Sequence, residues 1–246
     1  DVSGAKILNN KLVQTCKNFQ PDLIVLGHAD LINNETLQDL KINHPQLKIA
    51  QWFLDPLVKR GPDYEKNKKR IMDKMNVINK SFLTTSPSAL KFLDDNKNFF
   101  IPNPCDPSFE TLNNFNKNCD NDVFFAMSHG VHRGVLKPRY YDERATFLEK
   151  LIKRSGNIKF DFYGLNNVQP VWSNNFLKII SNCKMGLNLS RGKPLKYYSS
   201  DRIVQIIGNG LVTLIDENTQ YENFFNKNEM VFYKNISDLS EKILRI

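Results

Sequence analysis

The chain has 246 residues, a formal net charge of +8 and 41% hydrophobic residues, with no run as long as the ~20 apolar residues of a membrane span. This length accommodates one large or two modest domains. The four cysteines are far apart and form no C-x-x-C pair, which argues against a metal or redox centre and indicates a reducing, cytoplasmic setting. The positive charge favours acidic partners, but basic and aromatic residues are not clustered, which counts against nucleic acid.

Helix-period segments alternate with short apolar strands through the first hundred residues. Expected helices span 9–20, 34–47, 64–75 and 87–96, and expected strands span 21–30, 48–56, 76–86 and 97–104. Such alternation is typical of a parallel sheet with helices on both faces. The chain opens without a signal peptide or an initiator Met, so a preceding segment is expected.

The alternation breaks over 102–121, a segment rich in proline and asparagine that we interpret as an inter-domain linker. It then resumes. Strands are expected at 122–130, 158–164, 184–190, 211–216 and 229–234, with helices at 140–156, 172–183, 199–210 and 236–246, the last with a serine cap. The predicted fold class is α/β, with two Rossmann-like domains, 1–105 and 106–246, facing each other across a cleft.

The segment "KYYSSDRIVQIIGNGLVTLID", residues 196–216, places polar residues at the start of an otherwise apolar helix. Ligands of open α/β sheets lie outside the carboxyl ends of the strands, and helix starts attract phosphate. We therefore expect Ser199 and Ser200, next to Asp201, to cap this helix and donate their hydroxyls, while Arg202 supplies a cation. Gln205 faces the same ligand one turn later. An ordinary solvated helix cap is the alternative interpretation.

Three further segments end expected strands with polar or glycine residues. "MSHGVHRGVLKPR" contributes Arg133 and Lys137 in a cationic loop suited to a pyrophosphate. "FDFYG" ends at Gly164, whose backbone could pair with a nucleobase edge, and "LIVLGHADLI" carries His28. A simple turn glycine and a structural histidine are the alternatives for the last two.

Taken in order, these segments resemble the GT-B glycosyltransferases of group 1, and in particular the CgeB-like branch named after a spore maturation protein. "PDLIVLGHAD" resembles the family's strand ending in histidine, and "FFIPNPCDPSFE" resembles its IPN-x-x-D signature. "FDFYG" resembles the strand before the base-binding loop. "NLSRGKPLKYYSSDRIVQIIGNGLVTLID" resembles the donor-binding region in its R-x-x-E-x-x-x-x-G form.

The resemblance implies transfer of a sugar from a nucleotide diphospho-sugar to a glycan, lipid or protein acceptor. It also implies retention of configuration without a metal or cofactor, because cationic side chains and a helix start stabilise the leaving diphosphate. Residues 199–202, with Arg133 and Lys137, would contact the diphosphate, and Gly164 the base. His28 would contact the donor sugar.

Two departures from the family pattern stand out. Gln205 replaces the ribose-binding glutamate, and Tyr197 stands where the earlier acid is expected. The first domain is also short, since it begins near its fourth strand. A non-catalytic nucleotide-sugar binder and a nucleotide-sugar epimerase of the same fold therefore remain alternatives. The positive charge also favours peripheral contact with an anionic inner membrane face.

Overall fold

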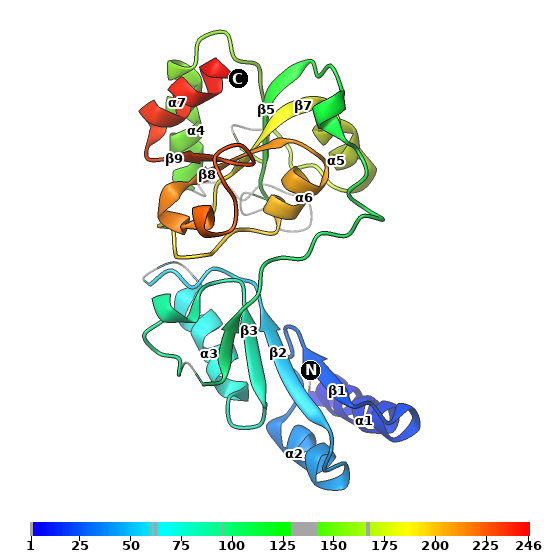
Figure 1. The fold of residues 1–246 in the computed structure, drawn as a ribbon. Coiled ribbons are helices and arrows are strands. Elements are labelled where there is room, and N and C mark those ends of the chain that lie inside the picture. Colours follow the sequence, from blue (N-terminus) through cyan, green and yellow to red (C-terminus); the bar gives the residue numbers. More distant parts are fainter. Residues whose placement is uncertain (1, 60, 62, 95, 129–141, 166–167) are drawn as a thin grey trace. The chain divides into compact units, whose positions relative to one another are not determined.

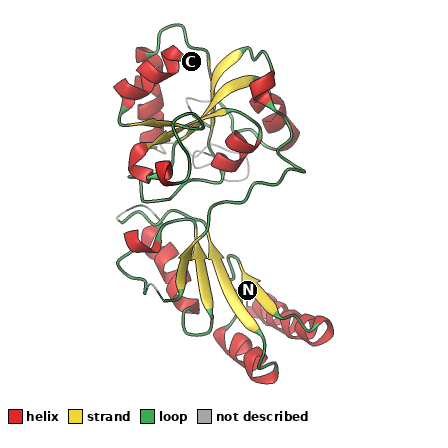
Figure 2. Ribbon diagram, viewed as in Figure 1, coloured by secondary structure: helices red, strands yellow, loops and turns green. Residues whose placement is uncertain are grey.

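The computed structural model describes residues 2–59, 61, 63–94, 96–128, 142–165 and 168–246 (Figure 1). The chain divides into two compact units, Asp1–Pro102 and Asn103–Ile246, which we call unit 1 and unit 2. The division falls slightly before the predicted boundary at residue 105. Each unit has its own parallel sheet with helices beside it (Figure 2), which confirms the predicted α/β fold class with two Rossmann-like domains.

Unit 1 has a four-stranded parallel sheet in the order β1-β2-β3-β4. One apolar cluster joins helix and strand residues, because Cys16, Leu37 and Ile49 all bury their side chains in it. The strands are β1 (Leu23–Leu26), β2 (Lys48–Phe53), β3 (Lys80–Leu83) and β4 (Asn98–Phe100), and the helices are α1 (Val2–Phe19), α2 (Asn34–Asn43) and α3 (Tyr64–Lys74).

The prediction of a helix over residues 87–96 is wrong. Among the described residues of this range, the only helical segment is a short 3-10 turn, Pro87–Ala89. Proline suits the first turn of a helix, but acidic residues at the opposite end of the segment oppose the helix dipole. The backbone carbonyl of Asp94 instead accepts a hydrogen bond from the side-chain amide of Asn98 at 2.6 Å, which connects the segment to the start of β4.

Unit 2 has a five-stranded parallel sheet in the order β6-β5-β7-β8-β9. Because β6 and β7 lie on opposite sides of β5, the direction of winding reverses between β5 and β7. Ligands of such sheets bind outside the carboxyl ends of the strands at this switch point. The strands are β5 (Asn121–Ala126), β6 (Phe160–Tyr163), β7 (Cys183–Asn188), β8 (Val212–Asp216) and β9 (Val231–Tyr233), and the helices are α4 (Glu143–Arg154), α5 (Ser173–Ile180), α6 (Arg202–Gly208) and α7 (Ile236–Arg245).

Alternating side chains of β5 assign the helices of unit 2 to two faces of the sheet. Val123 and Phe125 pack in a cluster with residues of α4 and α7, whereas Phe124 packs with residues of α5 and α6. Successive side chains of a strand point to opposite faces, and Figure 1 shows the two helix pairs on either side of the sheet. The helix pair α5 and α6 therefore frames one side of the switch point.

The segment before β5 packs into unit 2, although it was predicted to be a linker. The side-chain amide of Asn114 donates to the carbonyls of Ile180 and Cys183 at 2.7 and 2.9 Å. The backbone amide of Asn114 donates to Asn209 at 2.9 Å. A polar segment can be buried when its polar groups are paired in this way, so composition alone misassigned it.

The last helix, α7, is capped by Asn235 and not by the expected serine. The Asn235 side chain accepts hydrogen bonds from the amides of Ser237 and Asp238 at 3.0 and 3.1 Å. Within the described ranges, no helix is both long and apolar enough to cross a bilayer.

Candidate functional site

Arg202, the first residue of α6, ties together the two strand ends at the switch point of unit 2. Its Nε donates to the carbonyl of Ala126, the last residue of β5, at 2.8 Å. Its Nη1 donates to the carbonyl of Leu189, just after β7, at 3.4 Å, and to Ser200 Oγ at 2.9 Å. The guanidinium is thus held where an α/β sheet of this order places its ligands.

The charge of Arg202 is largely removed from water. The side chain is 9% exposed and lies 4.6 Å from the centre of the Phe125 ring. Burial, together with a smaller contribution from the positive charge of Arg144, lowers the pKa of Arg202 to about 10. Within the described chain its hydrogen bonds all go to neutral oxygens, so this buried cation would gain from an anionic ligand.

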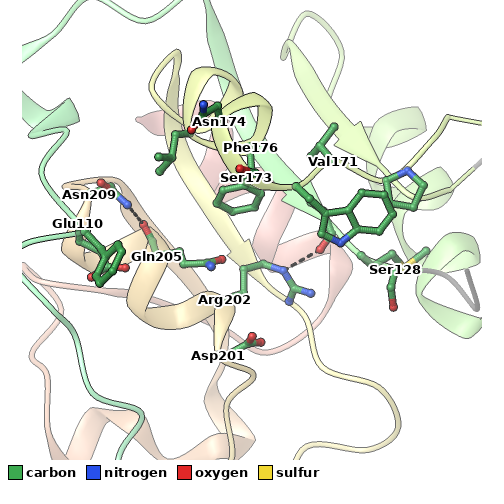
Figure 3. A pocket seen from close by; sticks show the side chains of 16 residues that line it. Glu110, Ser128, Val171, Ser173, Asn174, Phe176, Asp201, Arg202, Gln205 and Asn209 are labelled. Atoms are coloured by element: carbon green, nitrogen blue, oxygen red, sulfur yellow. Dashed lines mark hydrogen bonds between the residues drawn. The ribbon is translucent and has the colours of Figure 1, made fainter. Parts of the chain in front are cut away.

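A cavity of about 620 Å³ opens beside Arg202, and we call it the α5/α6 cavity. Arg202 and Gln205 project into it from α6, with Val171 and Phe176 across from them (Figure 3). Trp172, 54% exposed, offers an aromatic face at its edge. The lining residues are Phe109, Glu110, Ala126, Met127, Ser128, Pro170, Val171, Trp172, Ser173, Asn174, Phe176, Leu177, Asp201, Arg202, Gln205 and Asn209.

The predicted site residues at the start of α6 have two different placements. Asp201, Arg202 and Gln205 line the α5/α6 cavity. Ser199 and Ser200 do not: Ser199 Oγ lies 2.7 Å from the hydroxyl of Tyr221, and Ser200 Oγ donates to Asn188 at 2.8 Å. The residue at the cap position is Asp201, so the prediction that the two serines cap α6 is wrong.

Gly164 follows β6 and has a clear packing role. Its φ is +80°, and an added Cβ would overlap the carbonyl oxygen of Met127. Its amide donates to the carbonyl of Val168 at 3.1 Å, so this donor already has a protein partner. The predicted contact with a nucleobase stays a prediction, and close packing already accounts for a glycine here.

His28 lies in unit 1, after β1, within a chain of charged side chains. Its Nε2 is 3.2 Å from Asp55, and its ring lies 5.6 Å from that of Phe53. Asp55 is also 3.6 Å from Arg70, which makes a bidentate pair with Asp30. The side chain of His28 is 41% exposed, so it is both oriented and accessible.

Two residues predicted to contact the diphosphate, Arg133 and Lys137, lie outside the described residues. The structure adds another cation near the switch point, Arg144, which sequence reasoning missed. It makes a bidentate pair with Asp142 through Nε and Nη2 at 2.9 and 2.7 Å, and Arg191 Nε approaches the same carboxylate at 4.0 Å. Arg144 follows a helix-capping aspartate, which in a sequence resembles any solvated helix start.

In the described part of the chain, no three His, Cys, Asp or Glu side chains gather as they would around a metal ion. Metal independence therefore remains a prediction.

Comparison with known proteins agrees with this architecture. Residues 143–246 match a family model described as glycosyl transferase-like. No curated protein matches the chain. Among solved structures, the UDP-forming α,α-trehalose-phosphate synthase of Burkholderia xenovorans has a TM-score of 0.55 at 10% identity, covering 99% of this chain and 70% of that one. HepE of Anabaena in complex with UDP has a TM-score of 0.52 at 12% identity, with coverage of 96% and 71%. The apo structure of OtsA has a TM-score of 0.52 at 13% identity, with coverage of 99% and 69%.

At these identities the likeness to solved structures concerns the fold. The chain has the two Rossmann-like units of GT-B proteins, and it spans about 70% of the length of these structures. The family match, to the model described as glycosyl transferase-like, lies wholly in unit 2.

Proposed function

We propose that the protein is a glycosyltransferase of group 1, in its CgeB-like branch, that moves a sugar from a nucleotide diphospho-sugar to a glycan, lipid or protein acceptor. The observation that carries the proposal is the buried cation of Arg202, held between the ends of β5 and β7 beside a cavity of about 620 Å³. A cavity of this size accommodates a nucleotide. The glycosyl transferase-like match of unit 2 supports the same assignment.

Within this proposal the base and ribose occupy the α5/α6 cavity, and the diphosphate lies against Arg202. Gln205 accepts a hydrogen bond from a ribose hydroxyl, and Trp172 provides a face for stacking. The departing diphosphate is stabilised by this fixed cation, which requires no reorganisation as negative charge develops. HepE, a structural neighbour, was solved with UDP, which makes a uridine diphosphate donor the first one to test.

Several finer parts of the proposal rest on the family resemblance. They are His28 as the residue that contacts the donor sugar, and retention of configuration without a metal. A cytoplasmic setting rests on the spacing of the four cysteines. Peripheral attachment to an anionic membrane rests on the net charge of +8. Sedimentation with vesicles of anionic and of neutral lipid tests this attachment. Equal binding to both kinds of vesicle would show that the membrane proposal is wrong.

The test is calorimetry of the whole chain with UDP, GDP, ADP and CDP, and with the matching nucleosides. At a free concentration of 100 times its dissociation constant, the correct diphosphate should raise the free energy of unfolding of the protein by about 2.7 kcal/mol. Arg202→Lys keeps the charge but loses the planar fork of donors. We expect it to weaken binding of the diphosphate at least tenfold, while the nucleoside, which has no phosphate, binds as it does to the wild type.

The nucleoside serves as the control for folding, because a misfolded variant would lose both ligands together. If none of the four diphosphates binds the wild type, the proposed donor site is wrong. If Arg202→Lys binds the diphosphate as tightly as the wild type, the role of Arg202 is wrong.

A second test concerns Gln205, at the position where the resemblance places a glutamate. A carboxylate accepts a stronger hydrogen bond than an amide, by roughly 1 kcal/mol. Gln205→Glu should therefore tighten binding of the nucleoside about fivefold. Gln38→Glu, on the exposed surface of α2, adds the same charge at a residue that does not line the cavity, and should change nothing. Equal effects of the two substitutions would show that Gln205 does not contact the ribose.

The presence of Gln205 in the cavity also favours one alternative, a nucleotide-sugar binder without catalysis. Such a protein would bind the donor and neither transfer nor hydrolyse its sugar. Incubation of the labelled donor with candidate acceptors, followed by chromatography of the products, separates the two functions.

A further inference from the structure

Unit 2 contains a second cavity, of about 290 Å³, which we call the α4/β9 cavity. It lies between the start of α4, the segment after β7 and the ends of β8 and β9, and its described lining residues do not overlap with those of the α5/α6 cavity. Glu143 at the start of α4 accepts a hydrogen bond from the amide of Gly192 at 2.7 Å, which holds the segment after β7 over the opening. Its volume is at the lower end of small-molecule pockets, about 300 Å³, so it suits a ligand much smaller than a nucleotide.

Asn188, which lines the α4/β9 cavity, carries an unpaired donor. The guanidinium of Arg202 can only donate, so Ser200 Oγ accepts a hydrogen bond from it at 2.9 Å and donates one to Asn188 Oδ1 at 2.8 Å. The amide nitrogen of Asn188 is left over. Asn188 is 4% exposed, and among the described residues this nitrogen has no hydrogen-bond partner.

Tyr233, on β9, brings a second unpaired polar group. Its side chain is 1% exposed, lines the cavity, and has a hydroxyl without a partner in the described part of the chain. Burial raises the pKa of Tyr233, with a further contribution from the charge of Asp216, so the hydroxyl keeps its proton. Buried polar groups are rarely left unpaired, and two in one cavity indicate a ligand that can pair with both.

The remaining lining residues combine aromatic walls with balanced charge. Phe147 and Tyr198 contribute rings. In the described part of the chain, the carboxylate of Asp216 accepts hydrogen bonds from Asn218 at Oδ1, which leaves Oδ2 as an acceptor there. The acidic Glu143 and Asp216 are matched by Arg144 and Lys193. This balance does not select a charged ligand.

We propose that the α4/β9 cavity binds a neutral monosaccharide. Each sugar hydroxyl both donates and accepts, so one ring can accept from Asn188 and Tyr233 and donate to Asp216, while its apolar face packs against Phe147 or Tyr198. The inference goes beyond the proposed function and does not depend on it, because this cavity is separate from the proposed nucleotide site.

The test titrates the whole chain with D-glucose, D-galactose, D-mannose and N-acetyl-D-glucosamine, followed by saturation-transfer NMR and calorimetry. We expect one of them to bind in the millimolar range. Tyr233→Phe removes one hydroxyl and keeps the ring, so it should weaken that binding about tenfold, the effect of one hydrogen bond. The melting temperature of the unliganded Tyr233→Phe variant should stay the same or rise, because the lost hydroxyl had no partner in the described chain.

Tyr221→Phe is the matched control, since Tyr221 is equally buried and its hydroxyl contacts Ser199 outside the α4/β9 cavity. Its binding of the sugar should match that of the wild type. The methyl glycoside of the sugar that binds should also be titrated. If the methyl glycoside binds, the natural ligand is the end of a longer glycan; if it does not bind, the ligand is the free monosaccharide. If none of the four sugars binds, or if Tyr233→Phe binds as tightly as the wild type, the cavity holds only water and the proposal is wrong.

Discussion

Gly164→Ala should destabilise unit 2 far more than the same substitution at Gly156. Both glycines have positive φ, +80° at Gly164 and +54° at Gly156. The surroundings differ: a Cβ at Gly156 meets nothing within 4 Å, whereas one at Gly164 would lie 2.7 Å from the carbonyl carbon of Met127 and closer still to its oxygen. The pair therefore separates backbone strain from steric overlap.

The expected magnitudes follow from these two terms. An alanine in the left-handed region costs about 1–2 kcal/mol, and this is the whole expected loss at Gly156. At Gly164 the end of β6 must also move away from β5, and forced shifts in a packed interior cost about 1–3 kcal/mol more. Gly164→Ala should thus cost about 2–5 kcal/mol in total.

Hydrogen exchange measured by mass spectrometry suits a protein with two units, because each peptide reports the opening free energy of its own unit. Peptides from β5 and β7 should lose protection strongly in Gly164→Ala and weakly in Gly156→Ala. Peptides from unit 1 serve as the internal reference. Equal losses in the two variants would refute the packing role of Gly164.

Two further predictions concern buried polar contacts. Asp142→Asn should cost about 3–5 kcal/mol at neutral pH, because Arg144 would keep a buried charge without its partner. Burial raises the pKa of Asp142, but the hydrogen bonds and charge of Arg144 outweigh this and hold it below its usual range. The pair therefore stabilises the fold above about pH 4 and loses its effect as the pH falls through the lowered pKa, so denaturant titrations should show a shallower acid decline in the variant. Asn114→Ala should cost about 1–3 kcal/mol because it removes two buried hydrogen bonds to carbonyls. Asn116→Ala, on the exposed side of the same segment, should cost little, and equal losses would contradict the packing of this segment into unit 2.

Much of the candidate site could be predicted from local sequence. The positions of Arg202 and Gln205 follow from one turn of helix, because i and i+3 share a face, and both residues line the α5/α6 cavity. The roles of Ser199 and Ser200 could not be predicted in this way. Their hydroxyls contact Tyr221 and Asn188, which are distant in sequence or on another element.

Local pattern also determined the fold class. The alternation of helical and strand periods predicts parallel sheets with helices on both faces, since these periods depend only on backbone geometry. The pattern gave wrong predictions where tertiary contacts determine the structure. One case is the segment 87–96, whose described residues contain only a short 3-10 turn, Pro87–Ala89. The other is the asparagine-rich segment, where the buried Asn114 donates a hydrogen bond to a carbonyl of another element.

By itself, the sequence therefore determined most of the helices and strands, and which residues follow the strands. Only the tertiary structure decided the order of the strands, and with it the switch point between β5 and β7. It also decided that Arg202 is buried, that Gly164 is needed for close packing, and that Asn188 and Tyr233 meet at one cavity. The physical reason is that periodicity records which face of an element is buried, whereas burial of a particular polar atom depends on partners that can lie anywhere along the chain.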